Sequence, residues 1–296
     1  MPPAARWTRR LTMSLVAFAA VAIAAGCTIP RPVSESPRRY LDPVFQNVEV
    51  ARDVTYGSAP GISGLPEALK LDVYQPAEDT VTRRPVLLWL HGGGFVGGDK
   101  SAVAGTATSI ARLGYVVAAV NYRLLSPFGC GGTEDLPLEC YAAAIGAQHD
   151  TQAAVRWLRR YAAINRVDPN RIASGGVSAG AIASLLADWR ADDPGSSGNP
   201  GYPSHLNAAI SVSGGVPTNQ WIDGFDSPAM FFHGTEDDTV PYAWPLLNTR
   251  AMLDNGVPAL LRAFEAEGHT LTQQGVITQQ ASYFLWHALG LEDAPR

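Results

Sequence analysis

The chain has 296 residues, of which 46% are hydrophobic, and it carries a formal net charge of −5 at pH 7. This length and composition are sufficient for one large hydrophobic core. The acidic balance and the absence of basic patches with interleaved aromatic residues argue against a protein that binds nucleic acid.

The N-terminus has the pattern of a secretory signal. Arg6, Arg9 and Arg10 precede an apolar run over Leu11–Ala25, which is interrupted only by one threonine and one serine. This run is shorter than the roughly 20 apolar residues that a membrane-spanning helix requires. We therefore predict that residues 1–26 are a signal peptide that is absent from the mature protein.

The small residues before Cys27 resemble a bacterial lipobox, although Ala24 stands where such motifs more often carry leucine. The resemblance implies that Cys27 is lipidated. Two acyl chains on one cysteine are sufficient for stable anchoring, at about 0.8 kcal/mol per buried CH₂ group. Residues 27–44 would then comprise the lipidated cysteine and a tether rich in Pro and Ser. We expect an extracytoplasmic protein anchored in the cell membrane; plain secretion after cleavage near Ala25 is the alternative.

Residues 45–296 alternate between strand-like and helix-like patterns. Continuous apolar runs such as Pro85–Leu90 and Tyr115–Val120 are typical of strands that are covered on both faces. This alternation predicts a single α/β domain, in which one mostly parallel sheet carries helices on both faces. The other predicted strands include Val48–Tyr56, Leu71–Tyr74, Ala208–Val212, Ala229–Phe232 and Ala259–Ala266.

A long helix is predicted to follow the Gly/Pro-rich segment Ser126–Tyr141 and to end near Arg166. Apolar residues at helical spacing, among them Ala154 and Trp157, define the face that packs on the sheet. Three arginines fall on the other side and are expected to face solvent: Arg156, Arg159 and Arg160.

Two cysteines, Cys130 and Cys140, lie within this Gly/Pro-rich segment. In an oxidising compartment two cysteines at this spacing can pair, and we predict a disulfide between them. A metal site is not expected there, because no neighbouring Cys or His lies at ligand spacing. We predict neither a metal nor any other cofactor.

The sequence Gly176-Val-Ser-Ala-Gly180 matches the G-x-S-x-G pattern, between a short apolar strand end and a helix of small residues at Ala179–Leu186. A tight strand–turn–helix of this kind exposes the hydroxyl of Ser178 at the edge of the sheet. The following helix N-terminus directs free N–H groups toward any oxyanion that forms there. Ser178 is therefore the candidate nucleophile, whereas the pattern alone is also compatible with an ordinary Gly-rich turn.

A second Gly-rich segment, His91-Gly-Gly-Gly-Phe95, follows the strand Pro85–Leu90 directly. Consecutive glycines allow the backbone to approach a ligand and to direct N–H groups at it, as an oxyanion hole requires. The run Gly93–Ser101 also resembles a phosphate-binding loop. That pattern fails, however, because Asp99 interrupts the Gly-Lys step and would place an acid among the phosphates.

An acid and a histidine follow two later strands. The segment that begins at His233 comes after Ala229–Phe232 and contains three candidate acids, namely Glu236, Asp237 and Asp238. His269 comes after the last predicted strand. The chain order of serine, acid and histidine is the order expected for an α/β-hydrolase.

Taken together, these motifs resemble those of α/β-hydrolase carboxylesterases, close to the hormone-sensitive-lipase-like and related bacterial esterases. The resemblance covers essentially Val48 to Leu289. The motifs that carry it are His91-Gly-Gly-Gly-Phe95, Asn121-Tyr-Arg-Leu124, Asp168-Pro-Asn-Arg-Ile172, Gly176-Val-Ser-Ala-Gly180, His233-Gly-Thr-Glu-Asp237 with Val240-Pro241, and Gly268-His269.

The resemblance implies a catalytic triad of Ser178, Asp237 and His269. It also implies oxyanion donors at Gly93, Gly94 and Ala179. The chain departs from the hormone-sensitive-lipase-like pattern at Val177, where those enzymes usually have an acid. It also leaves little room for a cap domain, so an open site is expected.

We therefore expect a serine hydrolase that cleaves carboxylic esters, with short or medium acyl chains or ester-linked polymers as substrates, through an acyl-enzyme. A serine peptidase of the same fold is one alternative. A catalytically silent hydrolase fold that acts as a surface binding protein is another. The expected partners are the ester substrate and, through Cys27, the membrane.

Overall fold

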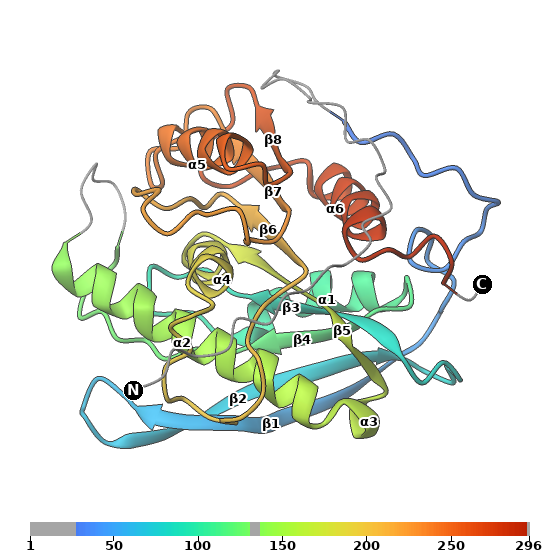
Figure 1. The fold of residues 1–296 in the computed structure, drawn as a ribbon, viewed down its shortest axis with the longest axis horizontal. Helices are drawn as coiled ribbons and strands as arrows, with labels where there is room; N and C mark the ends of the chain where they lie inside the picture. Colours follow the sequence, from blue (N-terminus) through green and yellow to red (C-terminus); the bar gives the residue numbers. More distant parts are fainter. Residues whose placement is uncertain (1–27, 131–136, 295–296) are drawn as a thin grey trace, which may run out of the picture.

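The computed structural model describes residues 28–130 and 137–294 (Figure 1). The predicted signal peptide and Cys27 therefore lie outside the described residues. Within the described ranges, no helix combines the length and the apolarity that a membrane crossing would require.

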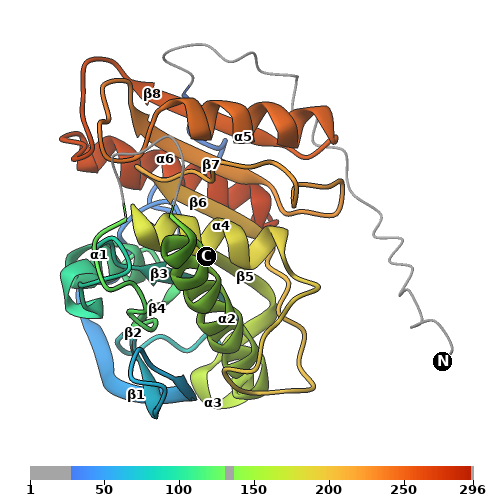
Figure 2. The ribbon, with the colours of Figure 1, turned by 90° about the vertical axis from the view of Figure 1, so that its left-hand side faces the viewer.

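One twisted sheet of eight strands, in the order β1-β2-β4-β3-β5-β6-β7-β8, runs through the molecule (Figures 1 and 2). β2 pairs antiparallel with both β1 and β4, and all the other neighbours pair parallel. The mostly parallel sheet that the sequence predicts is confirmed. The strands are β1 (Val48–Pro60), β2 (Pro66–Pro76), β3 (Arg84–Leu90), β4 (Val116–Val120), β5 (Val167–Val177), β6 (Ala208–Val212), β7 (Ala229–Gly234) and β8 (Ala259–Phe264).

Helices cover both faces of this sheet. α2, α4 and α5 pack on one face, and α1 and α6 pack on the other (Figure 2). Two short helices, the 3₁₀ helix η1 (Lys100–Val103) and α3 (Ala162–Asn165), lie in connections. The bounds of the longer helices are α1 (Ala104–Ala111), α2 (Leu138–Arg160), α4 (Ala179–Trp189), α5 (Ala243–Asp254) and α6 (Gln274–Ala288).

β3 shows why the central strands are continuously apolar. Successive side chains of a strand point to opposite faces, and here both faces are covered. Val86 and Leu88 belong to the core under α2 and α4, whereas Leu87 and Trp89 belong to the core under α1 and α6. All seven residues of the strand are buried.

The parallel register brings the C-terminal ends of six strands, β4, β3, β5, β6, β7 and β8, to one edge of the sheet. Gly176 of β5 is level with Leu90 of β3 and with Ser211 of β6, and β7 and β8 continue the alignment. The segments that follow these strands therefore meet at this edge, where open parallel sheets place their ligands. The segments at this edge contain every motif that the sequence analysis identifies as catalytic.

The prediction that the arginines of α2 face solvent is wrong for Arg156 and Arg159, which are buried. Arg156 donates hydrogen bonds to the carbonyl oxygens of Gly198 and Pro194, at 2.9 and 2.8 Å. Arg159 likewise donates to three backbone carbonyl oxygens, those of Pro169, Pro203 and His205. The connection between α4 and β6 folds over this side of α2, and its free carbonyl groups need donors.

The described part of the predicted tether, residues 28–44, is packed against the domain and is not a free linker. The Ile29 N–H donates to Gln280 Oε1 of α6 at 2.6 Å, and the Ile29 carbonyl accepts from Gln280 Nε2 at 3.1 Å. Tyr40 is buried in the core under α1 and α6. The Pro- and Ser-rich composition suggests a solvated chain, but backbone hydrogen bonds and one aromatic anchor hold this segment in place.

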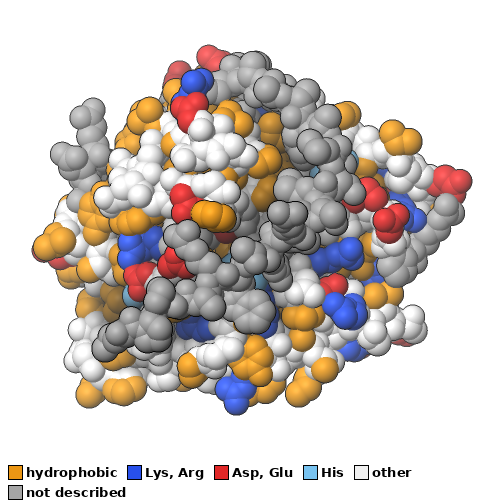
Figure 3. All heavy atoms as spheres, in the orientation of Figure 1, with side chains coloured by type: hydrophobic (Ala, Val, Ile, Leu, Met, Phe, Trp, Pro, Cys, Tyr) orange, Lys and Arg blue, Asp and Glu red, His pale blue; other side chains and the backbone are white. Residues whose placement is uncertain are grey.

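The face of the molecule in Figure 3 shows Lys and Arg side chains interspersed with Asp and Glu, with hydrophobic side chains distributed among them.

Cys130 and Cys140 form a disulfide with their Cα atoms 5.7 Å apart. This bond joins the segment after β4 to the first turn of α2.

Candidate active site

Ser178 lies in the turn between β5 and α4, in a backbone conformation with φ of 55° and ψ of −121°. A positive φ is uncommon for a residue with a side chain, and such strain occurs often at functional sites. Gly180 makes this turn feasible, because a Cβ atom there would lie 2.4 Å from the carbonyl oxygen of His91. At this turn the start of α4 therefore comes close to the end of β3, and Gly180 makes this contact possible because it has no side chain.

The three residues predicted as a triad meet at this turn. The Nε2 atom of His269 lies 2.9 Å from Ser178 Oγ. Its other ring nitrogen, Nδ1, lies 2.8 Å from Asp237 Oδ2 and 3.0 Å from Asp237 Oδ1. Both contacts are within hydrogen-bonding range, so a continuous relay runs from the hydroxyl through the imidazole to the carboxylate. Of the three candidate acids, Asp237 is the one that contacts His269.

Asp237 is buried, and its carboxylate is held by several donors. Oδ1 accepts hydrogen bonds from the backbone N–H groups of Thr239 and Val240, both at 2.9 Å. Burial by itself raises the pKa of this carboxyl, but the hydrogen bonds from His233, His269 and these two amides outweigh burial and lower the pKa below the ordinary value. Asp237 is thus a carboxylate at neutral pH, as a partner of a histidine must be.

His233 is fully buried beneath the acid turn. Its Nε2 atom lies 3.0 Å from Asp237 Oδ2 and 2.9 Å from the carbonyl oxygen of Val240. Because both neighbours are acceptors, Nε2 carries the proton and donates. His233 therefore helps His269 to orient the carboxylate, a role that sequence reasoning did not assign to it.

The glycines of residues 91–95 lie directly against the nucleophile turn. A Cβ atom on Gly92 would lie 3.3 Å from Ser178 Cβ. Gly93 has a φ of +125°, and a Cβ atom there would lie 2.1 Å from the carbonyl oxygen of Gly97, so only glycine fits. In the described part of the chain, no acceptor takes the N–H groups of Gly93 and Gly94. These amides and that of Ala179, the first residue of α4, are free to bind an anion.

Side-chain contacts from the Asn121-Tyr-Arg-Leu124 motif hold this glycine loop. The Tyr122 hydroxyl donates to the carbonyl oxygen of His91 at 2.7 Å, and the two rings stack with centroids 4.5 Å apart. Burial lowers the pKa of His91, which favours its neutral form. Asn121 Nδ2 donates to Asp99 Oδ2 at 2.7 Å. The side chains of this motif therefore hold the glycine loop in place.

Lys100, the lysine of the sequence that resembles a phosphate loop, is nearly buried between two acids. Its Nζ atom lies 3.1 Å from Asp53 Oδ1 and 3.1 Å from Asp72 Oδ1. The lysine is therefore engaged in joining the loop to β1 and β2.

The segment 126–130 covers the outer side of the glycine loop, residues 91–95. The Cys130 N–H donates to the Gly94 carbonyl at 3.2 Å, and the Ser126 N–H donates to the Phe95 carbonyl at 3.2 Å. Cys130 is in turn fixed to α2 by the disulfide. We call residues 126–130 the strap. It connects the disulfide to the backbone of the glycine loop.

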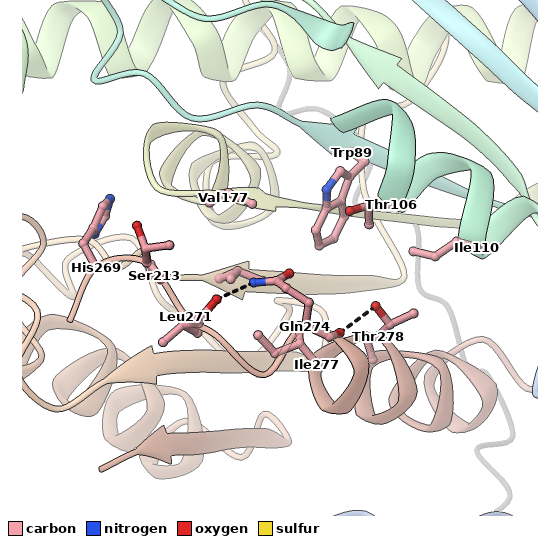
Figure 4. Close-up of a pocket in the computed structure, with 13 residues that line it drawn as sticks. Trp89, Thr106, Ile110, Val177, Ser213, His269, Leu271, Gln274, Ile277 and Thr278 are labelled. Atoms are coloured by element: carbon pink, nitrogen blue, oxygen red, sulfur yellow. Dashed lines mark hydrogen bonds between the residues drawn. The ribbon is translucent and has the colours of Figure 1, made fainter. Parts of the chain in front are cut away.

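A cavity of about 140 Å³ opens beside His269, between α1 and α6 (Figure 4). His269 and Ser213 lie at one end of it, and Ile110 and Thr278 lie at the other. The sequence did not reveal this cavity, because its walls come from residues that are far apart in the chain. The only local signal is that Ser213 directly follows a buried strand that ends at the catalytic edge.

The connection between β6 and β7, residues 213–228, is described throughout and contains neither helix nor strand. This connection is a loop throughout. The edge that carries Ser178 is not covered by a separate domain formed from this connection.

Two family models match the chain. One is described as BD-FAE and matches residues 71–215, and the other is described as Prolyl oligopeptidase family and matches residues 198–292. The first match contains Ser178 and the glycine loop, and the second contains Asp237 and His269. Together the two matches cover the chain from within β2 to just beyond α6.

Among the relatives, esterase LipI from Mycobacterium tuberculosis is 31% identical over 160 residues, which are 54% of this chain and 43% of that protein. Human carboxylesterase 3 is 31% identical over 204 residues, 67% of this chain and 32% of that protein. The matches shown by the first eight curated relatives cover between 20% and 43% of each relative's length.

The structure of a thermophilic esterase from the Planctomycetes species Thermogutta terrifontis with propionate bound superposes with a TM-score of 0.66. The two proteins are 24% identical, and the superposition covers 83% of this chain and 96% of that one. The chain therefore has the α/β-hydrolase fold. Its sequence relatives include carboxylesterases.

Proposed function

We propose that the protein is a carboxylic ester hydrolase in which Ser178 is the nucleophile, His269 the general base and acid, and Asp237 the partner of the histidine. The observation that carries the proposal is the continuous relay from Ser178 Oγ to Asp237, at 2.9 and 2.8 Å. Relatives that are named as esterases support the reaction class.

In the first half of the reaction, Ser178 Oγ attacks the ester carbonyl carbon while His269 Nε2 takes the hydroxyl proton. The carbonyl oxygen becomes an oxyanion, which the N–H groups of Gly93, Gly94 and Ala179 stabilise. Each such donor contributes about 3 kcal/mol to lowering the barrier. The bond to the leaving oxygen then breaks, and His269 donates its proton to the alkoxide, which releases the alcohol.

In the second half, water attacks the acyl-enzyme. His269 takes a proton from the water as it adds to the acyl carbon, and the same donors hold the second oxyanion. The bond to Ser178 Oγ breaks, the hydroxyl recovers its proton from His269, and the carboxylic acid leaves. Throughout, the Asp237 carboxylate keeps the tautomer and stabilises the imidazolium.

Turnover of 4-nitrophenyl acetate and butyrate by the wild-type protein and by Ser178→Ala tests this proposal. We expect loss of at least 10³-fold in kcat/KM for the variant, with unchanged circular dichroism and melting temperature, because the triad acts as a unit. Equal turnover by the two proteins would remove Ser178 from the mechanism.

A serine peptidase is the second candidate, because the Prolyl oligopeptidase family model covers the segment with Asp237 and His269. The same catalytic groups hydrolyse amides, so the geometry alone does not separate the two activities. An acetyl ester and an acetyl anilide with the same aromatic leaving group distinguish them. We expect kcat/KM for the ester to exceed that for the anilide by at least 10³-fold; a preference for the anilide would favour the peptidase.

We also propose that the protein is extracytoplasmic and is anchored through a lipidated Cys27. The Cys130–Cys140 disulfide supports an oxidising compartment. Because Ile29 is bound to α6, the anchor would hold the domain close to the bilayer. Mass spectrometry of the mature N-terminal peptide should show two or more acyl chains on Cys27, and Cys27→Ser should release the protein into the soluble fraction. An unmodified peptide would favour secretion.

A further inference from the structure

The cavity beside His269 has the size of a ring. Its volume of about 140 Å³ is close to that of a dry cavity of about 150 Å³ that holds benzene in another protein. The wall is mainly apolar, with side chains such as Trp89, Val212 and Ile277, and the described residues that line it include no Asp, Glu, Lys or Arg. A neutral group of about six heavy atoms fits this space, whereas a charged group would lose its hydration without a partner.

Two buried polar atoms on residues that line the cavity lack hydrogen-bond partners. Trp89 Nε1 and Ser213 Oγ are both inaccessible, and neither has an acceptor or donor in the described part of the chain. Buried polar groups are normally paired, so an unpaired one calls for an explanation. Because neither atom can be touched by a water-sized group, both face packed protein and not the open space of the cavity, and they offer no donor to a bound group.

Ser213 is held beside the nucleophile by the backbone. It has a φ of 50°, in the left-handed region that residues with side chains rarely adopt. The carbonyl of its neighbour Val212 accepts the N–H of Ser178 at 2.9 Å, and the Ser213 N–H donates to the Phe232 carbonyl at 2.8 Å. The end of β6 is therefore locked to the catalytic turn, and the cavity wall is fixed relative to Ser178.

The position of His269 decides which part of an ester this cavity receives. In the breakdown of the tetrahedral intermediate, His269 donates a proton to the leaving oxygen, so the alcohol lies on the histidine side of the acyl carbon. The oxyanion donors at Gly93 and Gly94 lie on the opposite flank, beside β3. His269, Thr270 and Leu271 form the mouth of the cavity.

We infer that this cavity is the subsite for the alcohol part of the substrate, and that it selects alcohols with a compact, ring-sized, neutral group. The inference rests on the proposed ester hydrolysis at Ser178 and specifies its substrate class. The acyl part of the ester binds outside this cavity, so a change in acyl-chain length should not affect binding of the alcohol part in the cavity.

Acetate esters of matched alcohols test the inference without a change of acyl group. Ethyl, cyclohexylmethyl and tetrahydropyran-4-ylmethyl acetate have alkyl leaving groups, and the last two differ only in one ring oxygen. We expect kcat/KM to rise at least tenfold from the ethyl to the ring esters. The ring oxygen should give no gain in kcat/KM over the ring carbon, because the wall of the cavity is mainly apolar.

Ala281→Leu fills the cavity from α6 and should lower kcat/KM for the ring esters at least tenfold more than for ethyl acetate. If this variant instead discriminates among ethyl esters of different acyl length, the cavity is an acyl subsite and the inference is wrong. Inhibition of the wild-type protein by cyclohexylmethanol needs no variant, and absence of inhibition at concentrations near the KM of the ring ester would also contradict it. Labelling of Ser178 by a fluorophosphonate separates a wrong subsite from a wrong reaction.

Discussion

At the scale of single residues, the carboxylate of Asp237 determines how the histidine is presented. His233 and His269 approach Oδ2 from two sides, and the amides of Thr239 and Val240 bind Oδ1. A carboxylate held by four donors has one orientation. This arrangement fixes the Nδ1–H tautomer of His269 and leaves Nε2 free to accept the proton of Ser178.

We expect Asp237→Asn to lower kcat by about 10⁴-fold, because the amide would favour the wrong tautomer of His269. Asp238→Asn is the matched control. Asp238 is exposed, and its side chain accepts a hydrogen bond from the Thr239 hydroxyl, at 3.3 Å. Steady-state kinetics with one ester should show less than a threefold change for Asp238→Asn. A larger loss for Asp238→Asn than for Asp237→Asn would move the acid by one residue.

His233 gives a second prediction at this scale. It is buried and donates to Asp237 and Val240, so His233→Phe would remove a donor and leave a carboxylate oxygen without its second partner. We expect kcat to fall tenfold to 100-fold with a smaller change in KM. His233→Gln, which can donate through its amide, should recover part of kcat. If the two variants lose stability but keep the kcat of the wild-type protein, His233 is structural only.

At the scale of elements, the strap links the disulfide to the glycine loop. Cys130 bonds covalently to α2 and, through its N–H, to the Gly94 carbonyl. Gly94 has little freedom on that side, because a Cβ atom there would lie 3.1 Å from the Cys130 nitrogen. The position of the Gly94 amide therefore depends on a covalent connection to a helix.

We expect the double variant Cys130→Ser/Cys140→Ser to show kcat lowered about threefold to 30-fold and KM changed less, since an oxyanion donor acts mainly in the transition state. Native disulfides of small loops contribute about 2–4 kcal/mol to stability, so the melting temperature should fall as well. A reductant should reproduce the kinetic change in the wild-type protein and have no effect on the double variant. Unchanged kcat in a folded double variant would limit the disulfide to stability.

Much of this edge could be predicted from the sequence, because its parts are local patterns. Ser178, Gly93 and His269 each lie within a short motif that directly follows an apolar strand, and parallel strands align their ends. The burial of Arg159 could not be predicted, because its acceptors lie 10 to 46 residues away in the chain. The same holds for the bond between Ile29 and Gln280, which are 251 residues apart. A helical pattern shows which face a residue occupies, but not which distant loop covers it.

At the scale of the whole molecule, Asp188 connects stability to pH. It is buried in α4, where it accepts hydrogen bonds from the Ser227 N–H at 3.0 Å and from the Ser227 hydroxyl at 2.7 Å. Burial raises its pKa to about 6, although the hydrogen bonds from Ser227 oppose this. The folded state therefore binds more protons than the unfolded state between pH 4 and pH 6.

This difference stabilises the folded state below about pH 4 and is lost as the pH rises through about 6. We expect the free energy of unfolding of the wild-type protein to decrease from pH 4 to pH 7 relative to that of Asp188→Asn, by on the order of 2 kcal/mol. Urea denaturation of both proteins at four pH values gives the comparison. Parallel pH profiles for the two proteins would show that Asp188 does not titrate in this window.

The central claim is that this α/β-hydrolase activates Ser178. Reaction of the mature domain with a fluorophosphonate probe, followed by identification of the labelled peptide by mass spectrometry, measures that activation directly and needs no knowledge of the natural ester. We predict a single adduct on Ser178 that is abolished in Ser178→Ala and strongly reduced in His269→Ala. Absence of labelling in folded wild-type protein, or labelling at another serine, would contradict the account.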